Sequence, residues 1–125
     1  MQRSDGERMA AEALQKPATV VPSGASIEVL RGFYAGLELA VDREWFVIGR
    51  GRGADGILAD ATISRAHAAI GYDTAEGFFV QDLGSTNGTL LNGERQKRGA
   101  LRDGDQIQIG KLLLRVSLPS AGVAR

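Results

Sequence analysis

The sequence predicts an all-β domain, folded as an antiparallel sandwich or barrel of short strands. Two observations lead to this fold class. The 17 glycines are spread along the 125 residues and separate short apolar runs, and several of these runs alternate apolar and polar residues as a half-buried strand does. No helix–strand rhythm and no fixed repeat accompanies them, so an alternating α/β fold is not expected.

About ten strands are expected, at nearly regular spacing and joined by turns rich in Gly, Asn and Asp. In chain order, the runs are Ile27–Leu30, Leu37–Val41, Trp45–Ile48, Ile57–Leu58, His67–Tyr72, Gly77–Asp82, Thr89–Leu91, Arg95–Lys97, Gln106–Ile109 and Leu112–Leu118. A sandwich of such strands displays its connecting loops at its two ends, and function is therefore expected in the loops.

The first 25 residues differ in texture from the rest. Ser4–Gln15 is Ala-rich and compatible with a short helix capped by Ser4 or Asp5, and Pro17 and Pro22 then interrupt any regular structure. We interpret residues 1–25 as a flexible leader, helical in part, and residues 119–125 as a C-terminal tail.

Composition excludes several classes of function. The 15 basic and 15 acidic side chains cancel to a net charge of +0, which argues against a general nucleic-acid binder. The chain has no cysteine and one histidine, so neither a disulfide framework nor a metal site is expected, and no cofactor is implied. No transmembrane helix or signal peptide is recognisable, and a cytoplasmic location is expected.

Three loops combine unusual polar content with well-packed flanking strands. They are Gly49–Arg50, Thr62–His67 and Gly84–Thr89, and Asn92–Gly93 follows shortly after the third. A planar guanidinium donates two parallel hydrogen bonds to a phosphate, and serine and threonine hydroxyls donate to its remaining oxygens. An asparagine amide both donates and accepts, as pairing with a peptide main chain requires. The loops are therefore suited to hold a phosphorylated side chain.

In order along the chain, these loops carry Gly-Arg, Ser-x-x-His, Ser-Thr-Asn-Gly-Thr and Asn-Gly. This series of four spaced motifs resembles the forkhead-associated (FHA) domain family over residues 26–118. The resemblance implies a sandwich of eleven strands in two sheets, whose loops at one end bind a phosphothreonine peptide without catalysing a reaction.

The resemblance also implies a role for each motif residue. Arg50 and Ser64 would contact the phosphate, Arg65 would add positive charge, Thr86 would lie beside the phosphothreonine, and Asn87 would hold the peptide main chain. His67 would be a buried residue connecting the loops, Gly49 and Gly88 would permit tight turns, and Asn92 would help to order the third loop. The choice of the residue three positions after the phosphothreonine is expected to involve Thr62 and the region 104–110.

Other interpretations of the same residues are less well supported. Gly51–Gly56 fits G-x-G-x-x-G, but a dinucleotide site needs a helix to begin there, and residues 57–62 are too short and broken for one. Ser64, His67 and Asp82 could be combined into a hydrolase triad, but no nucleophile-elbow motif accompanies them. Arg52 is interpreted as a solvated loop residue.

The expected partner is a phosphothreonine-containing protein, with a serine/threonine kinase acting upstream. Thr19 of the leader is a candidate for phosphorylation and for occupation of the chain's own site. The alternative function is a phosphate-independent assembly module, such as the cytosolic domain of a secretion-system component. The complete set of Arg50, Ser64 and Asn87 favours the phosphopeptide reader, because such assembly modules usually lack it.

Overall fold

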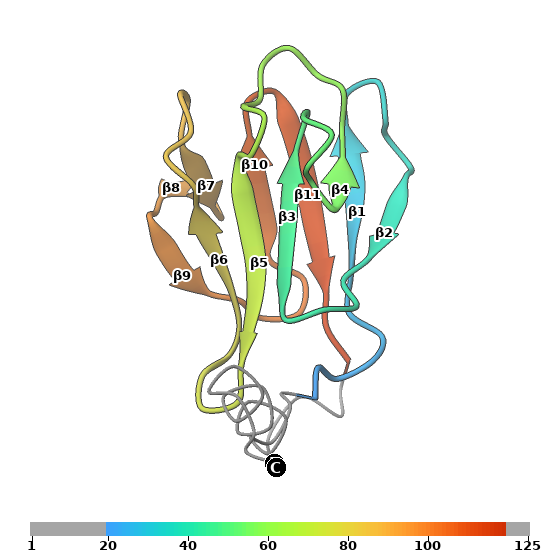
Figure 1. Cartoon of the computed structure of the whole chain (residues 1–125), viewed down its shortest axis with the longest axis vertical. Coiled ribbons are helices and arrows are strands. Elements are labelled where there is room, and N and C mark those ends of the chain that lie inside the picture. Colours follow the sequence, from blue (N-terminus) through green and yellow to red (C-terminus); the bar gives the residue numbers. More distant parts are fainter. Residues whose placement is uncertain (1–19, 120–125) are drawn as a thin grey trace, which may run out of the picture.

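The computed structural model describes residues 20–119, which form eleven strands in two sheets that face each other (Figure 1). The sandwich that the sequence predicts is thereby confirmed. The strands are β1 (Ser26–Arg31), β2 (Glu38–Ala40), β3 (Trp45–Gly49), β4 (Gly56–Ile57), β5 (Ala68–Asp73), β6 (Gly77–Asp82), β7 (Thr89–Leu91), β8 (Glu94–Arg95), β9 (Arg98–Ala100), β10 (Gln106–Ile109) and β11 (Leu112–Ser117).

Strand alternation explains how the core is filled. In β1, β10 and β11 every second side chain is apolar and buried, as a strand with one face on the core requires. The facing sheet contributes its inward side chains from β3, β5 and β6. The largest inward residues are Ile27, Val29, Ile107, Ile109, Leu112, Leu114 and Val116 from one sheet and Phe46, Ile48, Ile70, Phe78 and Val80 from the other.

The order of strands is β2-β1-β11-β10-β7-β8 in one sheet and β4-β3-β5-β6-β9 in the other. All pairs are antiparallel except β3 and β4, which run parallel with Ile48 opposite Gly56. The predicted antiparallel sandwich thus has one parallel pair, at the edge of this sheet. After β3 the chain folds back beside it, where the Asp55 N–H donates to the Val47 carbonyl at 2.8 Å. It then rises again through β4, so β3 and β4 both end at the same end of the sandwich.

The strand that the sequence did not predict is β9. Arg98–Ala100 contains no apolar alternation, and β9 pairs only with β6 in its sheet. In this pairing, Ala100 lies opposite Phe79 and Arg98 lies opposite Gln81. The guanidinium carbon of Arg98 lies 3.7 Å from the centre of the Phe79 ring, on the outer face of the sheet. This strand therefore covers an aromatic ring that would otherwise face solvent.

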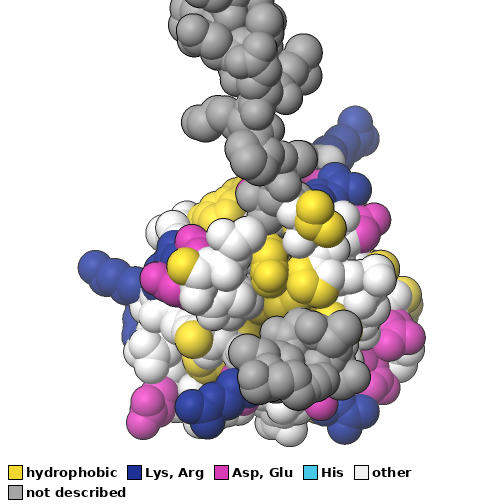
Figure 2. Space-filling model, turned by 90° about the horizontal axis from the view of Figure 1, so that it is seen from below, with side chains coloured by type: hydrophobic (Ala, Val, Ile, Leu, Met, Phe, Trp, Pro, Cys, Tyr) yellow, Lys and Arg dark blue, Asp and Glu magenta, His cyan; other side chains and the backbone are white. Residues whose placement is uncertain are grey.

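The two ends of the described chain lie together at the end of the sandwich opposite the β3–β4 loop (Figure 1). Seen from that end, the molecule shows exposed hydrophobic atoms bordered by charged side chains of both signs (Figure 2). Phe78, Leu101, Leu118 and Pro119 line a shallow hollow there. Between residues 20 and 119 no helix is long and apolar enough to cross a membrane. The expected Ser4–Gln15 helix and Thr19 lie outside the described residues.

Candidate functional site

Three loops meet at one end of the sandwich, at the top of Figure 1. They are the β3–β4 loop (50–55), the β4–β5 loop (58–67) and the β6–β7 loop (83–88). Backbone hydrogen bonds join the first two, because the Arg50 and Gly51 N–H groups donate to the carbonyls of Ser64 and Arg65 at 3.1 Å each. The fold thus brings together the three polar loops that the sequence singled out.

His67 connects the second loop to the third from a fully buried position, with 0% of its surface exposed. Its Nδ1 accepts from the Ser64 N–H at 3.0 Å, and its Nε2 lies 2.7 Å from the Gly88 carbonyl. Nδ1 must therefore be the bare nitrogen and Nε2 the donor, which describes a neutral imidazole. A ring bound in this way on both nitrogens has no free group for catalysis or for a metal.

Arg50 stands at the first loop with part of its guanidinium already fixed. Its Nε donates to the Ile63 carbonyl at 2.8 Å, and the two Nη groups have no protein acceptor within residues 20–119. Gly49, directly before it, permits the close approach of the second loop, because a Cβ on Gly49 would lie 1.9 Å from the Arg65 carbonyl oxygen. The arginine is thus held in place with its outer nitrogens available to an anion.

Ser64 and Thr86 lie beside each other across the second and third loops. The Thr86 N–H donates to Ser64 Oγ at 3.1 Å, which leaves the Ser64 hydroxyl proton free to be donated elsewhere. The Thr86 side chain is exposed, and Ser64 is half-buried. Two hydroxyls and the Arg50 guanidinium therefore come from three loops to one end of the molecule.

Asn87 is exposed and is oriented by the second loop. Its Nδ2 donates to the Thr62 carbonyl at 3.0 Å, and its Oδ1 has no hydrogen-bond donor among the described residues. Thr62 is fixed in turn, since its Oγ1 donates to Asp60 Oδ1 at 2.5 Å and accepts from the Lys111 N–H at 2.9 Å. The Thr62 hydroxyl and N–H bonds lower the pKa of Asp60. The free Asn87 carbonyl is available to a main-chain N–H of a bound peptide.

Gly88 and Arg65 complete the set, whereas Asn92 lies apart from it. Gly88 has a φ of +84°, which favours glycine, and its carbonyl accepts from His67. The Arg65 side chain is exposed and lines a hollow with Arg50. Asn92, at the other end of β7 from the third loop, bonds through its side chain to Asp105 at 3.1 Å and to the Gln106 N–H at 2.9 Å. Its bonds therefore order the β7–β8 turn against β10.

Asp82 organises the third loop, a role that sequence reasoning missed. Its carboxylate accepts from the Ser85 hydroxyl at 2.5 Å, from the Thr89 hydroxyl at 2.7 Å and from the Gly84 and Ser85 N–H groups. Burial raises the pKa of this carboxyl, but these hydrogen bonds outweigh burial and hold the pKa below its ordinary value. An Asp followed two residues later by Gly-Ser is the sequence signal of such a side-chain-to-backbone turn.

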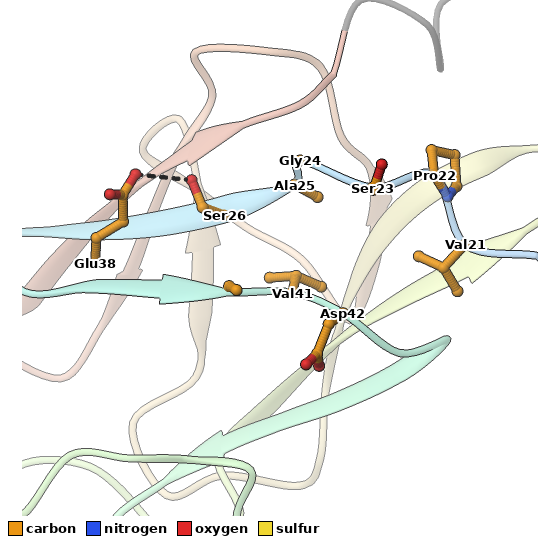
Figure 3. A pocket seen from close by; sticks show the side chains of 10 residues that line it. Val21, Pro22, Ser23, Gly24, Ala25, Ser26, Glu38, Val41 and Asp42 are labelled. Carbon is orange, nitrogen blue, oxygen red and sulfur yellow. Dashed lines mark hydrogen bonds between the residues drawn. The ribbon is translucent and has the colours of Figure 1, made fainter.

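A further hollow lies at the opposite end, between residues 21–26 and the stretch from β2 to Asp42 (Figure 3). Its lining includes Glu38, whose carboxylate accepts from the Ser26 hydroxyl at 3.1 Å, and Asp42, but no basic side chain. It is therefore unsuited to an anion. No cluster of His, Cys, Asp or Glu within residues 20–119 is arranged to hold a metal ion.

Comparison with known proteins agrees with this geometry. The FHA domain family model matches residues 46–110. The chain is 40% identical over 95 residues to the oxoglutarate dehydrogenase inhibitor of Corynebacterium efficiens and 40% identical over 95 residues to the glycogen accumulation regulator GarA of Mycolicibacterium smegmatis. Each match covers 75% of this chain, and they cover 66% and 60% of those two relatives. The chain thus spans less than two thirds of the length of these curated relatives.

Solved structures of FHA domains have the same fold. One comes from an analysis of phosphothreonine-dependent FHA domain interactions and has a TM-score of 0.69 at 30% identity, over 76% of this chain and 96% of that one. Another is the FhaA FHA domain complexed with the intracellular domain of Rv3910, with a TM-score of 0.67 at 31% identity, over 74% of this chain and 99% of that one. The match of the family model, the fold and the arrangement of the loops agree, and the chain belongs to the FHA domain family.

Proposed function

We propose that this chain binds phosphothreonine in a partner protein through the loops at the upper end of the sandwich. The observation that carries the proposal is the convergence of Arg50, Ser64, Thr86 and Asn87 from three loops. Backbone hydrogen bonds join the first loop to the second, and His67 joins the second to the third. In the proposed complex Arg50 and Ser64 donate to the phosphate, Arg65 adds charge, and Asn87 pairs with the peptide main chain. Relatives that are named an inhibitor and a regulator support a binding role over an enzymatic one.

The first experiment measures binding of the chain to a degenerate phosphothreonine peptide library and to the same library without phosphate. We expect micromolar binding that requires the phosphate and falls at least about tenfold in Arg50→Ala, since a charge-assisted hydrogen bond contributes about 1.5–3 kcal/mol. Arg102→Ala, an exposed arginine at the opposite end, is the matched control. Failure of the folded protein to bind any phosphopeptide would contradict the proposal and favour a phosphate-independent assembly module.

A serine/threonine kinase is the proposed upstream enzyme, and the cytoplasm is the proposed compartment.

We also propose that Thr19, once phosphorylated, occupies the site of its own chain. The six residues between Thr19 and the first strand lie at the end opposite the loops, where Val21 packs against the core. Self-binding therefore requires residues 20–25 to detach from the sandwich. Phosphorylated and unphosphorylated chains are compared for affinity toward one phosphothreonine peptide. Equal affinity of the two forms would refute self-binding.

A further inference from the structure

The hollow lined by Arg50 and Arg65, beside the candidate phosphothreonine site, contains three arginines. Its lining consists of Val47, Arg50, Gly51, Arg52, Gly53, Ala54, Arg65 and Ala66. Ser64, Thr86 and Asn87 do not line it, so it is distinct from the region that carries the hydroxyls. Arg50 and Arg65 thus belong both to the candidate phosphothreonine site and to this hollow.

Negative charge is kept out of this arginine hollow. The nearest acidic residue of the loop is Asp55, whose Oδ1 accepts from Arg43 and whose Oδ2 accepts from the Val47 N–H, each at 2.8 Å. Within residues 20–119, neither Arg52 nor Arg65 forms an ion pair or a side-chain hydrogen bond. Three like charges placed together repel one another, and an anion in the hollow would relieve that repulsion.

The backbone around the hollow is fixed, although the arginines are exposed. The Gly51 N–H donates to the Arg65 carbonyl at 3.1 Å, and a Cβ on Gly51 would lie 3.1 Å from the Cβ of Arg65. The Ala54 N–H closes the loop on the Gly51 carbonyl, also at 3.1 Å. The positions from which Arg52 and Arg65 extend are therefore held by the fold and do not depend on a ligand.

We propose that the arginine hollow binds a second anionic group of the partner, and that Arg52 is the residue that reads it. The proposal rests on the proposed phosphothreonine site, because it adds a subsite for a residue flanking the phosphothreonine in the same peptide. The net charge of +0 for the whole chain makes a general polyanion an unsuitable ligand, whereas an acidic peptide segment fits a local cluster. The second group is a phosphate or a carboxylate, which share this chemistry. Arg52 is thus assigned to recognition, against its interpretation as a solvated residue.

The test uses one phosphothreonine peptide with neutral flanks and two derived series. In the first series a second phosphothreonine is moved through the four positions on each side, and in the second an aspartate is moved in the same way. We expect one or two adjacent positions to increase the affinity about fivefold or more at low salt, the effect of about 1 kcal/mol from a partly exposed charge pair. The gain is expected to shrink as salt rises. A gain in the first series alone identifies phosphate as the group read, and a gain in both identifies negative charge in general.

Arg52→Ala is expected to lose this gain while keeping its affinity for the peptide with neutral flanks, and Arg102→Ala is expected to keep both. Binding of the neutral peptide without a gain at any position, or a gain that persists in Arg52→Ala, would overturn the arginine hollow alone. Failure to bind the neutral phosphothreonine peptide would overturn the proposed function and this subsite with it.

Discussion

Single residues at the upper end divide into those that hold the loops and those left free to bind. His67 uses both ring nitrogens on loop backbone, and Asp82 uses both carboxylate oxygens on the third loop. The outer nitrogens of Arg50 and the Oδ1 of Asn87 have no partner within residues 20–119. The buried groups are therefore satisfied internally, and the exposed ones retain hydrogen-bonding capacity for a ligand.

Asp82 gives the fold a specific pH dependence. Because its pKa is lowered in the folded state, the ionised carboxylate stabilises the fold at pH values above the unfolded pKa of about 3.9, and this stabilisation is lost as the pH falls through the lower folded value. In Asp82→Asn, the amide NH₂ that replaces Oδ2 cannot accept from the Gly84 and Ser85 N–H groups, and the substitution should cost about 1–2 kcal/mol at pH 7. Urea denaturation between pH 7 and pH 2 should show the difference from wild type shrinking toward acid pH.

Glu94→Gln is the matched control, because Glu94 is exposed and accepts no side-chain hydrogen bond within the described chain. Its stability curve should run parallel to that of the wild type. A constant difference between Asp82→Asn and wild type across the whole pH range would show that the substitution acts through packing and not through the carboxylate charge.

At the scale of elements, the parallel pair of β3 and β4 places the site. It returns the chain to the upper end, so that the β3–β4 and β4–β5 loops lie against each other through the bonds of Arg50 and Gly51 to Ser64 and Arg65. Gly49 is the point of closest approach, since its missing side chain makes room for the Arg65 carbonyl. The geometry of the site thus depends on the absence of a side chain at Gly49.

Gly49→Ala should therefore destabilise the fold by about 2–4 kcal/mol, because its Cβ would meet backbone that has little freedom to move. The backbone movement that makes room for this Cβ should also displace Arg50 and Arg65, and it should weaken phosphothreonine peptide binding by the folded variant.

Gly53→Ala in the same loop is the matched control. A Cβ at Gly53 would meet no heavy atom within 4 Å, and the φ of this residue is not positive, so stability should change by less than about 0.5 kcal/mol. Equal effects of the two substitutions would contradict this account.

Ten of the eleven strands were predictable, nine because their apolar residues alternate or cluster in the sequence and β8 because it follows the Asn92-Gly93 turn. β9 was not, because Arg98-Gly99-Ala100 becomes a strand only by pairing with β6 and stacking on Phe79, which are tertiary interactions. The direction of β4 was equally hidden, since a two-residue strand carries no signal of its neighbour. The exposure of Trp45, at 41%, follows from its place on the outer face of the sheet.

The site, too, has features that the local sequence predicts and features that depend on tertiary contacts. The spaced motifs predicted which side chains would gather at the upper end, because they follow strands that end there. The Asp82 network and the contact between Asn87 and Thr62 depend on how two loops approach each other in space. Asn92, placed by its motif beside the third loop, instead bonds to Asp105 and Gln106 because β7 carries it away from that loop.

At the scale of the whole molecule, the folded unit begins before the first strand. The sequence placed the domain at residues 26–118, but Val21 packs against the core, Ala25 is 3% exposed, and the Ala25 carbonyl accepts from the Val41 N–H at 2.8 Å. We propose that residues 20–25 contribute to the free energy of unfolding of the domain.

A fragment covering 20–119 should match the full chain in free energy of unfolding, whereas a fragment covering 26–118 should lose about 1–3 kcal/mol through the lost apolar burial and the unpaired Val41 N–H. Urea denaturation of the three proteins measures this directly. Equal stability of the two fragments would place the boundary at residue 26, and both fragments should keep phosphothreonine peptide binding, because the loops lie at the other end of the sandwich.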